Sequence, residues 1–132
     1  MFCFNTKFKS SVLSMSNISL YIKPIEIFTS KSFLSIVADK QNPKSTKLLV
    51  RARVKGDIEE IFTTATVQET PDADYRFRAW IDRQEVKKAF SDQIERLSYS
   101  NFKSSVSDTL RLSPLMDVWQ TMYSHQESMV QA

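Results

Sequence analysis

The sequence is poor in the residues that build small catalytic and metal-binding sites. It contains one cysteine, one glycine and one histidine among 132 residues. Cys3 alone cannot form a disulfide within the chain or a cysteine-based metal site, so a reducing compartment, the cytoplasm, is the expected location. Gly56 alone cannot form a glycine-rich loop around phosphates. The sequence therefore predicts no cofactor and no bound metal.

Long apolar runs are also missing. No stretch approaches the ~20 apolar residues that a membrane-spanning helix needs. Serines and Asn17 interrupt the apolar residues of 1–30, which argues against a signal peptide. We therefore expect no membrane association.

Residues suited to catalysis are few. His125 lies late in the last expected helix, with no partner motif that would make it a general base. Asp72 and Asp74 could form a carboxylate pair, but acids beside Pro71 are typical of turns. No catalytic residue is predicted, and a small enzyme whose groups converge from distant positions stays an alternative.

The positive charge of the chain is small and uneven. The net charge is +3, and residues 1–30 contribute +2 of it through three lysines and one glutamate. The remaining residues are nearly neutral, so net charge gives little support to nucleic-acid binding. Residues 1–30 also keep no steady hydrophobic period. We expect them to be a poorly ordered N-terminal extension, with residues 31–132 forming a single domain.

Hydrophobic periodicity predicts an α+β fold for the rest of the chain. Alternating or β-branched stretches predict strands at 33–39, 48–55, 64–69 and 75–81. Residues 17–28 contain Pro24 and are expected to form an edge strand at most. The strands imply a four-stranded, mainly antiparallel sheet.

Helical spacing predicts the helices. A short helical turn is expected at 57–62, and longer helices at 82–97, 99–106 and 113–129. Asp82 and Glu85 predict a capping box, and Ser113 before Pro114 predicts the start of the last helix. The resulting order is β-β-α-β-β-α-α-α, with the helices packed on one face of the sheet.

Cations alternate with apolar residues in two of the expected strands. If these strands are neighbours, one outer sheet face carries Arg51, Arg53, Lys55, Arg76, Arg78 and Trp80. Such a face could bind phosphates and stack a base on the indole. The alternative is an ordinary solvated face whose arginines pair with nearby acids. Tyr75 and Phe77 alternate with these cations, so we expect both in the core.

The last helix offers a second candidate surface. Trp119, Met122 and Tyr123, with Met116 and Met129, provide more apolar area than one sheet face readily covers. Such a stripe is either core or the interface to a partner or a second copy.

Four segments from residue 33 onward resemble a family of small uncharacterised bacterial proteins of about a hundred residues. They are LLVRARVKGDIEEIF (48–62), ETPDADYRFRAW (69–80), the Tyr-x-Asn-Phe-Lys of 99–103 and VWQTMY (118–123). The family carries a histidine-bearing stretch before its last helix, where this sequence reads DTLRLSPLMD. The resemblance implies a stand-alone bacterial cytoplasmic domain and no particular activity.

These observations predict a non-enzymatic interaction or regulatory domain that binds another protein or a second copy of itself. A nucleic-acid or polyanion binder using the basic sheet face is the alternative.

Overall fold

The computed structural model describes residues 2–4 and 24–131, with side chains for 24–131; residues 1, 5–23 and 132 lie outside this description. The chain divides into two compact units, Met1–Leu97 and Ser98–Ala132. We call them the sheet unit and the helical unit and describe each by itself.

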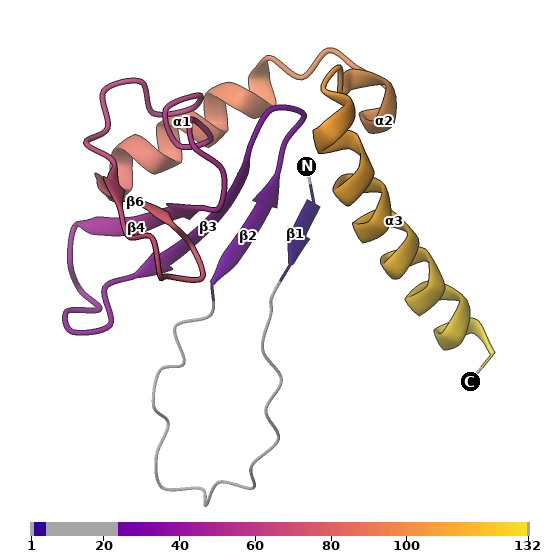
Figure 1. Cartoon of the computed structure of the whole chain (residues 1–132), viewed down its shortest axis with the longest axis horizontal. Coiled ribbons are helices and arrows are strands. Elements are labelled where there is room, and N and C mark those ends of the chain that lie inside the picture. Colours follow the sequence, from indigo (N-terminus) through magenta and orange to yellow (C-terminus); the bar gives the residue numbers. More distant parts are fainter. Residues whose placement is uncertain (1, 5–23, 132) are drawn as a thin grey trace, which may run out of the picture. The chain divides into compact units, whose positions relative to one another are not determined.

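Within residues 2–4 and 24–97, the sheet unit contains an antiparallel sheet and a helix (Figure 1). Its strands are β1 (Phe2–Phe4), β2 (Ile25–Phe28), β3 (Phe33–Ala38), β4 (Lys47–Ala52), β5 (Gln68–Glu69) and β6 (Phe77–Asp82). They lie in the order β1-β2-β3-β4-β6-β5, and every neighbouring pair is antiparallel. Helix α1 (Arg83–Glu95) contacts β6 and β4. The predicted α+β class with an antiparallel sheet is confirmed.

The predicted number of four strands is wrong, because β1 and β2 extend the sheet beyond β3. β2 is an interior strand in the described residues, although Pro24 suggested an edge at most. Pro24 lies just before the strand, so its missing N–H falls outside the hydrogen-bonded ladder. The expected extension, residues 1–30, therefore contributes two strands where it is described, and the rest of it lies outside the described residues. The domain boundary at residue 30 stays a prediction.

Two predicted elements are shorter or different in the structure. Of the strand expected at 64–69, only the last two residues form a strand, which is β5. Residues 57–62 form consecutive turns, with the Phe62 N–H donating to the Ile58 carbonyl at 2.8 Å, and no helix. Gly56 introduces these turns with a φ of 93°, a conformation that glycine adopts without strain.

The hydrophobic core lies on the face of the sheet that α1 covers. Alternate residues of β3, β4 and β6 point into it, together with Val86 of α1 and with Ile58 and Phe62 of the turns. Leu34, Val50 and Ala52 are fully buried there. This arrangement leaves the other residues of each strand on the opposite surface, which we call the outer face.

The helical unit contains α2 (Phe102–Ser105) and α3 (Thr109–Val130). α3 begins four residues before the predicted start. Asp108 is its N-cap and accepts hydrogen bonds from the backbone N–H groups of Leu110 and Arg111 at 2.9 and 3.4 Å. The predicted cap at Ser113 is therefore wrong, and Pro114 lies inside the helix.

Candidate functional site

A row of polar residues crosses the outer face of the sheet. Glu26 of β2 is paired with Ser35 of β3. Ser35 is paired in turn with Arg51 of β4, and Arg51 with Arg78 of β6. Partners in a strand ladder point to the same side of the sheet, so these four side chains share one surface.

The two arginines of this row lie directly opposite each other, an arrangement that like charges make unfavourable. The structure turns them toward different acceptors. Arg51 Nη2 donates to Ser35 Oγ at 2.7 Å, and Arg78 Nε donates to the backbone carbonyl of Tyr75 at 3.0 Å. A second Arg78 nitrogen, Nη2, lies 3.4 Å from Asp74 Oδ1. The charge repulsion is thereby relieved within the sheet unit.

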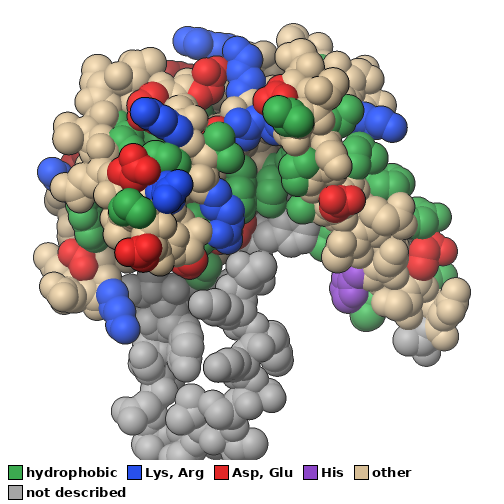
Figure 2. Space-filling view, viewed as in Figure 1, with side chains coloured by type: hydrophobic (Ala, Val, Ile, Leu, Met, Phe, Trp, Pro, Cys, Tyr) green, Lys and Arg blue, Asp and Glu red, His purple; other side chains and the backbone are tan. Residues whose placement is uncertain are grey.

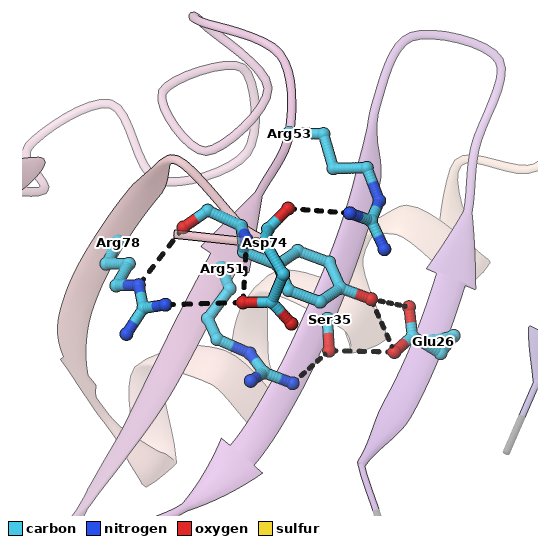
Figure 3. Close-up of polar contacts among 7 residues, drawn as sticks. Glu26, Ser35, Arg51, Arg53, Asp74 and Arg78 are labelled. Carbon is cyan, nitrogen blue, oxygen red and sulfur yellow. Dashed lines mark hydrogen bonds and ion pairs between the residues drawn. The ribbon is translucent and has the colours of Figure 1, made fainter. Parts of the chain in front are cut away.

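Glu26 is the buried centre of the row, with 3% of its surface exposed. The Tyr75 hydroxyl lies 2.8 and 2.9 Å from its two carboxylate oxygens, and Ser35 Oγ donates to Oε1 at 2.9 Å (Figure 3). Burial, and then the hydrogen bond to Glu26, raise the pKa of the Tyr75 phenol above its usual value. Tyr75 is therefore held as a neutral donor to a carboxylate removed from water.

The Tyr75 ring lies under two cations. The guanidinium carbons of Arg51 and Arg53 are 4.5 and 4.1 Å from its centroid, distances typical of cation–π contacts. Arg53 Nη1 also donates to the backbone carbonyl of Asp74 at 2.6 Å. These contacts fix the segment before β6 across the outer face. We call the seven residues the outer-face cluster: Glu26, Ser35, Arg51, Arg53, Asp74, Tyr75 and Arg78.

Tyr75 is buried, as predicted, but it lies outside the main hydrophobic cluster that contains Phe77. β6 begins at Phe77, so the alternation that places Phe77 in the core does not extend back to residue 75. Tyr75 instead packs on the opposite surface, where its hydroxyl finds an acceptor, as a buried tyrosine requires.

The predicted basic sheet face is only partly assembled. Arg51, Arg53 and Arg78 come together in the outer-face cluster. Arg76 precedes β6 and pairs with Glu69 at 3.5 Å, and Lys55 is exposed beyond the end of β4. Trp80 is paired with Leu49 in the ladder and is 46% exposed.

Asp74 is one of the acids expected to pair with the arginines of a solvated face, and it lies 3.4 Å from Arg78 Nη2. Three other members of the cluster, Glu26, Ser35 and Tyr75, were not predicted on this surface. Glu26 interrupts an apolar strand (IEIF), and Ser35 interrupts another (FLSIVA). A lone polar residue inside an apolar strand is the available signal, since burial there demands a hydrogen-bond partner. The partner itself, Tyr75, lies 49 positions away from Glu26 in sequence.

The second candidate surface lies on α3. Trp119 and Tyr123 stack with ring centroids 5.4 Å apart and planes at 7°, and each is 45% exposed. Met122 is 40% exposed, Met129 64% and Val130 78%. At 100° per residue these five side chains share one side of the helix, while Gln120, Ser124 and Ser128 point away. We call Trp119, Met122, Tyr123, Met129 and Val130 the α3 apolar face; Figure 2 shows hydrophobic side chains at the surface along α3.

No family model matches the sequence, and no curated protein or solved structure shows significant similarity to the chain. The resemblance to small bacterial proteins stays a prediction. Among the described residues, no helix is both long and apolar enough to cross a membrane, and no three histidine, cysteine or acidic side chains gather as metal ligands.

Proposed function

We propose that the chain is a non-enzymatic protein-interaction module of the bacterial cytoplasm and that the α3 apolar face is its docking surface. The observation that carries this proposal is the stacked and half-exposed pair of Trp119 and Tyr123. Tryptophan and tyrosine dominate the binding energy of protein interfaces because they bury large areas with few rotatable bonds. Their stacking orders both rings before a partner arrives.

The composition of α3 supports the same proposal. A helix that is exposed to solvent on all sides is usually stabilised by many i,i+4 ion pairs. α3 has 22 residues, and its only residues of formal charge are Arg111, Asp117 and Glu127. Its exposed half, from Trp119 onward, therefore has little to stabilise it in solvent, and burial of its apolar side against a partner would supply the missing stabilisation at about 25 cal/mol per Å².

The outer-face cluster gives less support to the alternative of polyanion binding. A phosphate would have to compete with partners that Arg51, Arg53 and Arg78 already hold. Arg76 is engaged by Glu69 as well, although this exposed pair is a weak competitor. We infer that the arginines mainly hold the Asp74–Tyr75 segment against the sheet.

Affinity capture tests the proposal. The full-length chain is immobilised and exposed to nuclease-treated native lysate. We expect discrete proteins to be retained by the wild type and by Gln120→Ala but lost from Trp119→Ala. Gln120 is the matched control because it lies on the polar side of the same helical turn. Identical retention by all three proteins would refute the docking role of the α3 apolar face.

A further inference from the structure

The α3 apolar face lies in the second half of the helix. Leu115, one turn before Trp119, lies on the same side of α3 but is already buried, with 6% of its surface exposed. From Trp119 to Val130 the apolar side chains are between 40% and 78% exposed. The uncovered stretch spans about three turns, or ~16 Å.

We infer that this stretch docks against the same stretch of a second copy of the chain, with the two α3 helices antiparallel. The inference rests on the proposed function and names the partner of the same surface. The two-fold axis would pass between Ser124 and His125, so that Trp119 of one copy faces Val130 of the other. In this arrangement each free stretch covers the other along its whole length.

The covered half of α3 decides the orientation. In a parallel pair, the two regions around Leu115 would lie side by side, and whatever already covers this residue would hold the helices apart. In an antiparallel pair, Leu115 of each copy lies beyond the last turn of the other. The helix dipoles also oppose each other only when the helices are antiparallel.

The chemistry of the face suits an identical partner. Glu127 is the one residue of formal charge in 119–130, and at 100° per residue it falls at the margin of the apolar side. At the centre of the face lies Gln126, which is polar but uncharged. A surface without charge at its centre offers nothing to an acidic or basic partner, whereas another mainly apolar surface buries area on both sides. The free stretch of a second copy is such a surface and is present at the same concentration.

The area of the face sets the strength of the interaction. The face covers one side of about three turns of a single helix, so we expect the pair to bury no more than the ~1,200 Å² at the lower limit of standard stable interfaces. We therefore expect a transient dimer that is populated at high micromolar concentrations and dissociates on dilution.

Sedimentation equilibrium of the full chain between about 10 µM and 1 mM tests self-association. We expect the average mass to rise with concentration for the wild type and for Gln120→Ala. Trp119→Ala should weaken the dimer at least ~10-fold, because it removes an aromatic anchor of the interface. A wild-type monomer across the whole range would overturn the inference. Capture of other proteins that depends on Trp119 would still support the proposed function, so the two claims fail separately.

Thiol cross-linking tests the orientation in a Cys3→Ser background. Gln126→Cys lies near the proposed two-fold axis, so a short bifunctional maleimide should join two copies. Val130→Cys residues would lie ~16 Å apart along the axis and should not be joined. Efficient cross-linking at both positions would indicate parallel helices. Cross-linking at neither position would show that the two copies do not pair through this face. Either result overturns the inference.

Discussion

At the scale of single residues, Glu26 is a carboxylate buried on the outer face of the sheet. A buried carboxylate costs free energy unless its oxygens are hydrogen-bonded. Two hydroxyls meet this demand, from Ser35 and from Tyr75. The Tyr75 phenol ties β2 to the segment before β6 across two intervening strands, so we regard it as the main determinant of the outer-face cluster.

We predict that Tyr75→Phe destabilises the sheet unit by about 1–3 kcal/mol, the usual cost of leaving a buried acceptor unsatisfied. Glu26 Oε2 would lose its one hydrogen bond from the described residues, while Oε1 would keep the bond from Ser35. Urea unfolding followed by circular dichroism measures the change. Tyr99→Phe in the helical unit is the control and should stay close to the wild type; equal effects of the two substitutions would argue against the Tyr75–Glu26 contact.

The raised pKa of Tyr75 predicts a dependence of stability on alkaline pH. The protonated phenol is favoured more in the folded state than in the unfolded chain, so its contribution is complete below pH 10. As the pH rises above 10, the unfolded tyrosine ionises first, and the contribution is lost through the higher folded pKa. The difference in unfolding free energy between wild type and Tyr75→Phe should therefore be constant from pH 7 to 9 and shrink by pH 11. A difference that grows with pH in this range would contradict the assignment.

At the scale of elements, the start of α3 can be tested, because the structure places the N-cap at Asp108 and the sequence predicted it at Ser113. Asp108 → Ala should cost about 0.5–2 kcal/mol of helix stability, since its carboxylate accepts from two backbone N–H groups of the first turn. Ser113→Ala should be nearly neutral, because Ser113 lies inside the helix. Hydrogen exchange of residues 109–113 and far-ultraviolet circular dichroism measure both variants. A larger effect at Ser113 would restore the start predicted from the sequence.

The elements that the sequence predicts well are those with a clear period. The alternating stretch 48–55 contains most of β4 (Lys47–Ala52), and the helical stripe of 82–97 contains α1 (Arg83–Glu95), which begins after the Asp82 cap. The α3 start was misplaced because Ser113-Pro114 resembles a helix start more strongly than Asp108 does. Residues 17–28 were expected to form an edge strand at most, because Pro24 cannot donate a hydrogen bond within a sheet. Only residues after Pro24 enter β2, so this restriction does not apply to the strand.

The candidate site is less predictable than the fold. The pairing of Arg51 with Arg78 depends on strand order, which local periodicity does not determine. To predict the position of the Tyr75 side chain, one would have to know that the chain bends over the outer face before β6. The α3 surface was predicted from Trp119, Met122 and Tyr123 because helical spacing alone places them together.

At the scale of the whole molecule, the two units have different kinds of surface. The sheet unit satisfies the polar groups of its outer-face cluster largely within itself, and Arg51 Nε and Glu59 Oε2 are the buried side-chain atoms without a partner among its described residues. The helical unit leaves the side chains of the α3 apolar face between 40% and 78% exposed. This contrast is why we place the docking surface on α3 and not on the basic sheet face.

The salt dependence of affinity capture tests this central claim most directly. Complexes captured by the wild type are washed with buffers from 50 mM to 500 mM sodium chloride, with Trp119→Ala as the reference. Docking through the α3 apolar face predicts that Trp119-dependent retention persists at 500 mM, because burial of apolar surface is not screened by salt. Retention that falls steeply with salt and is unaffected by Trp119→Ala would contradict the account and indicate a polyanion bound through the arginines.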